Sequence, residues 1–235
     1  MSARQSNRIA VVVAHADDEV LGCGGTLKRH TLAGDEVWTI VMADGETSRF
    51  ADPSTAEVQA RIARRQHAAK EASGILGVQH THVHTFPDNR LDTKPLLDIV
   101  RAVEHHIHEI QPEIVYTHHA GDVNVDHRLV HEAVVTACRP GPGHPVGQLL
   151  FFETVSSTEW QPPHSAPAFL PNWFVDITPT LEFKLAALRQ YDDEMRPWPH
   201  PRSYAGVERL AQWRGASIGC DAAEAFMLGR RIRRA

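Results

Sequence analysis

The sequence predicts an α/β fold in which helices cover both faces of a mostly parallel β-sheet. Two observations lead to this prediction. Between Arg8 and Cys138, short apolar runs rich in β-branched residues alternate with longer stretches in which apolar residues recur at the helical period. Clusters of charged and polar residues directly follow two of the apolar runs, as is typical where parallel strands end at a ligand-binding edge.

The expected strands and helices alternate regularly in this part of the chain. Runs of Val, Ile and Thr mark the strands, the helical period marks the helices, and Gln111-Pro112 ends the third helix. Starting with a strand, the elements cover residues 8–14, 25–32, 36–43, 56–76, 80–86, 95–110, 114–118 and 126–138. Because right-handed crossovers join strands that alternate with helices, this order predicts a parallel sheet of Rossmann-like type.

The last third of the chain, residues 139–235, is richer in loops. Pro and Gly gather in residues 139–146, 161–171 and 196–203. Strands are expected over residues 151–155 and 173–177, and helices over residues 180–191 and 204–213. Because no internal repeat is present, the simplest organisation is a single domain over residues 1–235 in which this third completes the substrate site.

Composition restricts the class of protein. Of 235 residues, 42% are hydrophobic and 23% are charged, as in water-soluble globular proteins, and no apolar run reaches the roughly 18 residues of a membrane span. A net charge of -5 argues against a nucleic-acid-binding protein. The polar start MSARQSNR lacks the pattern of a secretory signal, so we expect a cytoplasmic protein. A homo-oligomer is compatible with the sequence.

Charged residues at the end of the first strand indicate a cation. In VVVAHADDEVLGCGG, residues 11–25, the strand is followed by His15, Asp17 and Asp18. One aspartate could cap the next helix. Several carboxylates in one place repel one another, however, so we expect a divalent metal between them.

The second half of such a site is expected at the end of the fourth strand, in YTHHAGDVNVDHRLVHEAV, residues 116–134. There His127 follows Asp126, which stands at the start of a helix, so its ring can point back toward the crevice. Two histidines and one carboxylate form an open zinc site of the catalytic kind.

These two stretches resemble the PIG-L/LmbE-like zinc-dependent deacetylases. Residues 15–19, HADDE, with residues 22–25, GCGG, are similar to the HPDDE and GxGG signature of that family. Asp126-His127 is similar to the end of its HPDH motif. The resemblance implies that His15, Asp18 and His127 bind Zn²⁺ or another divalent transition metal.

The resemblance further implies an amidase acting on linear amides, which removes the N-acetyl group from an N-acetylated amino sugar, such as N-acetylglucosamine, or from its conjugate. Asp17 is then the general base. A metal lowers the pKa of a water toward about 7, and Asp17 can accept the proton as that water attacks the amide carbonyl. Asp17 can return the proton to the departing amine.

Two positions depart from the family pattern. Ala16 replaces a proline, which affects the stiffness of the loop. Asn124 replaces a histidine that stabilises the oxyanion in many members, and it can donate only a neutral hydrogen bond. We therefore expect either His118 or His119 to supply a cation, or the reaction to differ. Asp126, next to the last ligand, is also a catalytic candidate.

Several other polar residues are candidates for binding the substrate. One lies on the long helix at the place of a family arginine, two follow the third strand, and two lie in a proline-rich loop. They are Arg64, Asp88, Arg90, His200 and Arg202. An exposed helix arginine, an ordinary turn and a plain surface loop are the respective alternatives. Glu224 is interpreted as part of a solvated helix face.

Three other functions are compatible with parts of the sequence. The same fold and metal site could serve a thiol-conjugate amidase or a hydratase, or the protein could bind a metal without catalysis, although Asp17 then serves no purpose. A dinucleotide-binding protein would also have a glycine-rich turn after its first strand. Residues 22–25 do not have the GxGxxG spacing, however, and residues 15–19 would repel a pyrophosphate.

Overall fold

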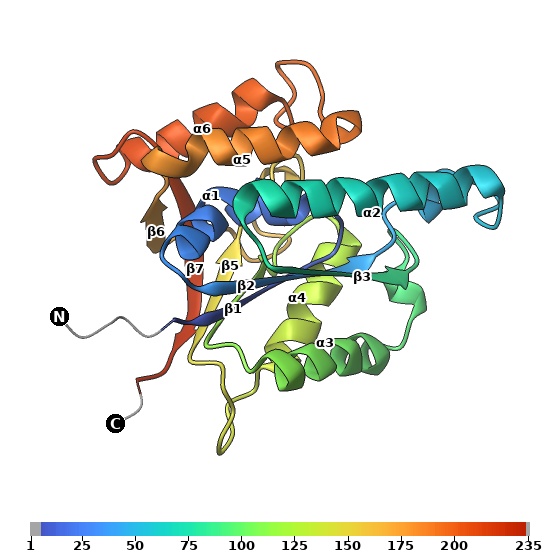
Figure 1. Ribbon diagram of the computed structural model, residues 1–235, viewed down its shortest axis with the longest axis horizontal. Coiled ribbons are helices and arrows are strands. Elements are labelled where there is room, and N and C mark those ends of the chain that lie inside the picture. The colour runs from blue at the N-terminus through green and yellow to red at the C-terminus, as the bar shows by residue number, and fades with distance from the viewer. Residues whose placement is uncertain (1–5, 234–235) are drawn as a thin grey trace.

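The computed structural model describes residues 6–233, which form a three-layered α/β fold (Figure 1). One sheet holds seven strands in the order β3-β2-β1-β4-β5-β7-β6. The strands are β1 (Arg8–Val13), β2 (Glu36–Ala43), β3 (His80–Phe86), β4 (Ile114–His118), β5 (Gln148–Phe152), β6 (Trp173–Asp176) and β7 (Ala223–Arg231). The predicted fold class is confirmed, because the first five strands of the chain are mutually parallel.

Helices cover both faces of the sheet, with α3 and α4 on one face and α1, α2, α5 and α6 on the other (Figure 1). They are α1 (Asp18–Leu32), α2 (Ala56–Leu76), α3 (Leu96–Ile110), α4 (Val125–Ala137), α5 (Leu181–Leu188) and α6 (Tyr204–Ala216). Short 3-10 helices lie at Thr47–Arg49, Leu91–Thr93, Thr158–Trp160, Thr178–Thr180 and Arg189–Glu194. No helix within residues 6–233 is long and apolar enough to cross a membrane.

Strand β1 is buried on both faces, which explains its unbroken apolar sequence. Ile9, Val11 and Val13 pack toward α1 and α2, whereas Ala10 and Val12 pack toward α3 and α4. This alternation follows from the two-residue period of a strand. The core therefore has two halves, with β1 between them.

The strand order reverses at β1. The chain runs from β1 to β2 and β3 on one side and then crosses to β4 on the other side of β1. Ligands bind beyond the carboxyl ends of parallel strands at such a reversal. The polar residues that follow β1 and β4 therefore face one crevice.

Several elements differ from the expected ones. Helix α1 begins at Asp18 instead of residue 25 and has a kink at Cys23, whose φ is -149° and ψ 18°. Strand β5 ends at Phe152 instead of residue 155, and α5 ends at Leu188, where a 3-10 helix continues the chain. Strand β7 was not predicted. Most of the polar start used for the cytoplasmic prediction lies outside the described residues.

The glycines after β1 allow close packing at this kink. A Cβ on Gly25 would lie 2.8 Å from the Ile177 side chain, and one on Gly22 would clash with Phe152. The backbone N–H groups of Gly25 and Thr26 donate to Glu224 at 3.0 and 2.7 Å. Glu224 is thus a buried residue of β7, not part of a solvated helix. Its carboxylate occupies the N–H groups that a dinucleotide phosphate would need.

Candidate active site and metal centre

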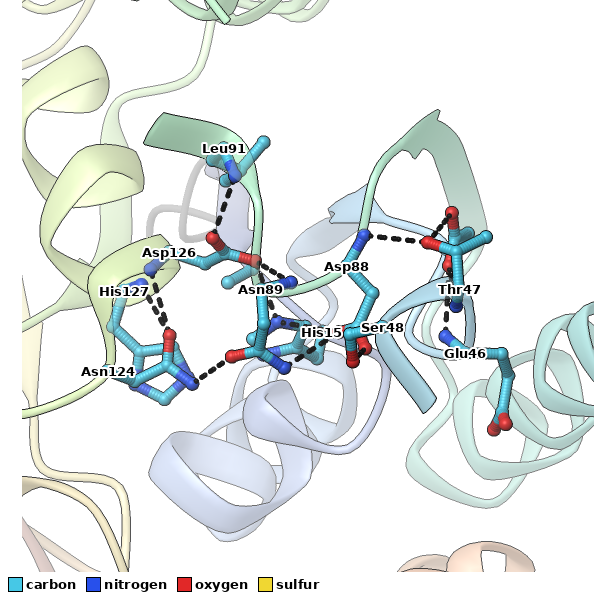
Figure 2. Close-up of polar contacts among 12 residues, drawn as sticks. His15, Glu46, Thr47, Ser48, Asp88, Asn89, Leu91, Asn124, Asp126 and His127 are labelled. Carbon is cyan, nitrogen blue, oxygen red and sulfur yellow. Dashed lines mark hydrogen bonds and ion pairs between the residues drawn. The ribbon is translucent and has the colours of Figure 1, made fainter. Parts of the chain in front are cut away.

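The loops that follow β1 and β4 bring His15, Asp18 and His127 together. Figure 2 shows further polar residues around the rings of His15 and His127. Asp18 begins α1, and His127 lies in the first turn of α4. Asp18 Oδ2 lies 3.3 Å from His15 Nδ1 and 3.3 Å from His127 Nε2. One donor atom from each residue falls within 4.8 Å of the other two. The three predicted ligands are therefore within reach of a single ion.

Carboxylates stand behind both histidines. His15 Nε2 lies 3.1 Å from Asp126 Oδ2 and 3.3 Å from Asp88 Oδ1. His127 Nδ1 lies 3.2 Å from Asp122 Oδ2. In metal sites, such carboxylates fix the orientation and tautomer of a ligating histidine. On each ring, the nitrogen that faces Asp18 is the one left for a metal.

The electrostatics of this place favour a cation. Burial alone would lower the pKa of both histidines, yet their contacts with carboxylates raise it to about 10 for His15 and about 9 for His127. Asp18 Oδ1 is buried and has no hydrogen-bond partner within residues 6–233. Two imidazoles and a carboxylate with a free oxygen fit Zn²⁺, whose catalytic sites use three protein ligands.

Asp17 lines the pocket directly before α1. Its φ is 130°, a conformation that is strained for a residue other than glycine and is found mainly at functional sites. Its side chain does not cap the helix, and its Oδ1 is buried without a hydrogen-bond partner in the described chain. Burial raises the pKa of Asp17 to about 6, and Arg202 opposes that rise. The carboxylate is therefore held at the pocket by something other than helix capping.

Arg202 reaches Asp17 from the loop that precedes α6. Its Nη1 donates to Asp17 Oδ2 at 2.8 Å, and its Nε donates to Ser156 Oγ at 3.1 Å. Its backbone N–H donates to His200 Nδ1 at 3.0 Å, so His200 orders the loop without lining the pocket. The C-terminal third of the chain thus contributes a cation to the site.

Comparisons with known proteins identify the family to which this chain belongs. Residues 10–138 match the family described as PIG-L: GlcNAc-PI de-N-acetylase. The chain belongs to the PIG-L family. It is 31% identical over 196 residues to the uncharacterized deacetylase YaiS of Escherichia coli (strain K12), a match that covers 81% of this chain and 93% of that protein.

Two diacetylchitobiose deacetylases are also similar. That of Thermococcus kodakarensis (strain ATCC BAA-918 / JCM 12380 / KOD1) is 28% identical over 205 residues, 80% of this chain and 70% of that protein. The structure of N,N'-diacetylchitobiose deacetylase from Pyrococcus horikoshii, complexed with its inhibitor MPG, has a TM-score of 0.75 at 22% identity. It covers 95% of this chain and 84% of that chain, and it shows a shared fold.

Asn124 has two functions in this PIG-L protein (Figure 2). Its Oδ1 caps α4 by accepting from the backbone N–H groups of Asp126 at 2.8 Å and His127 at 3.4 Å. Its Nδ2 lies at the pocket and donates to Asn89 Oδ1 at 3.0 Å. Asp126 accepts from the N–H groups of Asn89 and Leu91 at 2.7 and 3.0 Å. Asp126 therefore fixes this loop and orients His15.

The structure contradicts the expectation that His118 or His119 supplies a cation to the pocket. His118 lies behind His127, with 3.9 Å between ring centroids, and its Nε2 accepts from the N–H of Ala14 at 2.9 Å. Burial lowers the pKa of His118 well below its usual value, so the ring is neutral. His119 Nε2 lies 2.9 Å from a backbone carbonyl of the C-terminal third. Neither residue lines the pocket.

Arg65 lies at the pocket, and its neighbour Arg64 does not. Arg64 is exposed on α2, in a second, outer cavity. Arg65 is buried, donates to the Ala16 carbonyl at 2.9 Å and to Glu46 Oε1 at 3.0 Å, and contacts Glu194 through Nη2. The loop after β1 is therefore held by an arginine of α2.

Of the two predicted substrate contacts that follow β3, one lies at the pocket and the other does not. Asp88 is buried and lines the pocket, where Ser48 donates a hydrogen bond to it. Arg90 is exposed and does not line the pocket.

The pocket around the donor set has a volume of about 130 Å³, and the adjoining outer cavity has about 380 Å³. Both are lined by Arg49, Arg65 and Glu194. The candidate metal site thus lies beside a larger polar space.

Proposed function

We propose that the protein is a metal-dependent deacetylase that hydrolyses the N-acetyl group of an N-acetylated amino sugar or its conjugate. The observation that carries the proposal is that Asp17, whose buried Oδ1 has no hydrogen-bond partner within residues 6–233, lines the same pocket as His15 and His127. Asp18 completes the donor set with these two histidines. The relatives described above are named as deacetylases, which supports the same reaction.

A divalent metal held by His15, Asp18 and His127 would lower the pKa of a water and polarise the amide carbonyl. Asp17 accepts the proton of the attacking water and returns it to the nitrogen of the amine, so acetate and a free amine leave. Arg202 keeps the Asp17 carboxylate ionised and fixes one of its oxygens, which leaves the other for the proton.

Asn124 is the neutral donor of the pocket. Because its Oδ1 is bound by backbone N–H groups of α4, its Nδ2 is oriented toward the pocket, where it can donate to the oxyanion that forms during attack.

The two cavities indicate how the substrate lies. The smaller one holds the acetamido group near Asp17, and the larger one accepts the remainder of the molecule. Its lining combines Arg61, Arg64 and Arg65 with Glu46 and Glu194, so it suits a polar conjugate better than an apolar one.

The test is acetate release by zinc-loaded protein from N-acetylglucosamine and a set of its conjugates. Asp17→Asn should keep about one metal at this site and lose about 10²- to 10⁴-fold in kcat, the usual contribution of a general base. His127→Ala should lose both the metal and the activity. The control is Asp98→Asn, the same change at an exposed carboxylate of α3.

Full activity of Asp17→Asn would refute the role of the base. Metal binding without acetate release from any substrate would favour the thiol-conjugate amidase or hydratase reaction at the same site.

A further inference from the structure

Three histidines gather between β3 and α3. His82 and His84 are alternate residues of the edge strand β3, so both face the same side of the sheet. Helix α3 covers that side (Figure 1), and its His106 is buried there. None of the three belongs to the donor set of the active site.

The three rings are close enough to share an ion. His84 Nε2 lies 2.9 Å from His106 Nε2. The ring of His82 has its centroid 4.5 Å from that of His84 and 4.7 Å from that of His106. One nitrogen from each ring lies within 4.8 Å of the other two.

Core packing does not explain this choice of residues. The neighbouring inward positions of α3 are apolar, as Val103, Ile107 and Ile110 show. A hydrogen bond between His84 and His106 accounts for two of the rings but not for the third. At the buried position of His106, an apolar side chain would avoid the cost of burying imidazole.

We propose that His82, His84 and His106 form a second metal site, which binds Zn²⁺ or a similar transition-metal ion such as Ni²⁺ or Cu²⁺. Neutral imidazole suits these ions, and the lack of a carboxylate among the three ligands disfavours Mg²⁺ and Ca²⁺. Around tetrahedral zinc with Zn–N bonds of about 2.0–2.1 Å, ligand nitrogens stand roughly 3.3 Å apart. The His84 and His106 rings need to separate by only a few tenths of an ångström to reach that spacing.

The protonation state of His84 and His106 agrees with the geometry of the three rings. Burial, and then the neighbouring rings, lower the pKa of His84 and His106 to about 4. Both are neutral at pH 7, which is the form that binds a metal.

The position of the cluster gives metal binding a structural effect. Strand β3 and helix α3 flank the loop of residues 87–95. In this loop, Asp88 contacts His15 and Asn89 donates a hydrogen bond to Asp126. An ion between β3 and α3 would connect the two elements that flank that loop. Binding to the folded chain alone also raises its stability by mass action.

The test uses the full chain with Zn²⁺ as the only added ligand. Elemental mass spectrometry after equilibrium dialysis should find two Zn²⁺ per wild-type chain and one in the active-site variant Asp18→Asn/His127→Ala. The variant His84→Gln/His106→Gln should also keep one, and the combination of all four changes should keep none. The matched control is His108→Gln, at an exposed histidine of α3.

Because His106 is buried, His82→Gln serves as a second variant at an exposed position. It should lower the affinity for the second Zn²⁺ by at least about 10-fold, because changes to residues around a metal site usually cost that much affinity. Circular dichroism in chelator checks that each variant folds, and Zn²⁺ should raise the Tm of Asp18→Asn/His127→Ala only while the three histidines are present.

The proposal is overturned if Asp18→Asn/His127→Ala binds no Zn²⁺, or if its Zn²⁺ survives the loss of His84 and His106. Failure of the proposed active-site metal would give a different result. If wild type binds one Zn²⁺ that only His84→Gln/His106→Gln removes, the second site stands and the proposed active-site metal falls.

Discussion

Arg202 donates a hydrogen bond from Nη1 to Oδ2 of Asp17 at 2.8 Å, although 185 residues separate them in the chain. Arg202 comes from the loop before α6, and Asp17 comes from the loop that joins β1 to α1. Burial raises the pKa of Asp17, and the guanidinium opposes that rise. Arg202 therefore makes the largest contribution to keeping the proposed base ionised near neutral pH, and Arg65 acts in the same direction.

Arg202→Ala should lower kcat by about 10- to 100-fold, because hydrogen bonds to charged groups contribute about 1.5–3 kcal/mol. Without the guanidinium, the pKa of Asp17 rises, so the acidic limb of the pH profile should move to higher pH. Arg202→Lys keeps a positive charge, so the pH of its acidic limb should stay closer to that of wild type. The measurement is kcat and KM against pH, with Arg101→Ala at an exposed position of α3 as control. An unshifted profile would contradict the assignment.

Asp122→Asn should weaken the active-site metal by about 10- to 100-fold, as is usual when the carboxylate behind a ligating histidine is lost. Asp122 lies 3.2 Å from His127 Nδ1 and accepts from Thr158 Oγ1 at 2.7 Å, so it links the ligand to the loop after β5. Competition with a chelating dye gives the affinity, and the exposed Asp92→Asn is the control. Equal affinities in the two variants would rule out this orienting effect.

Glu224→Gln should lower the free energy of unfolding by about 3–5 kcal/mol, since it leaves the buried Lys184 ammonium without its partner. Lys184 Nζ lies 2.6 Å from Glu224 Oε1, and both side chains are about 4% exposed. Urea unfolding measures the change. The double variant Lys184→Met/Glu224→Gln should lose less than the single one, because no unpaired charge remains. A larger loss in the double variant would contradict this explanation.

Local patterns predicted the parallel part of the sheet and the helices that follow it. Runs of β-branched residues mark strands that are buried on both faces, and helical period marks α2, whose observed ends are the expected ones. The same helical period could also have predicted that Arg65, and not Arg64, lies on the buried face of α2. The buried residues of α2 include Val58, Arg65, Ala69 and Leu76, which lie on one helical face.

Contacts made between distant segments could not be predicted in this way. Glu194 reaches Arg65 from a 3-10 helix whose sequence shows no periodic pattern, and Glu224 binds the N–H groups at the kink of α1 from a strand. His118 is a residue for which the sequence suggested a role that the assembled fold does not support. It ends β4 where a catalytic residue is expected, but its place under the His127 ring depends on packing that only the assembled fold defines.

The pKa values of His84 and His106 predict a pH dependence of stability in the metal-free protein. Both lie near 4 in the folded chain, against 6.5 for an ordinary histidine. Well above pH 6.5 the two histidines are unprotonated in both the folded and the unfolded chain, so they contribute no pH dependence there. As the pH falls from 6.5 toward 4, these two histidines become protonated in the unfolded chain but stay neutral in the folded chain. The free energy of unfolding therefore decreases. In chelator, this decrease should be steeper for wild type than for His84→Gln/His106→Gln, as measured by urea unfolding at half-unit steps of pH. The exposed His67→Gln should follow wild type, and parallel curves for all three proteins would show that the cluster binds protons as freely as the unfolded chain.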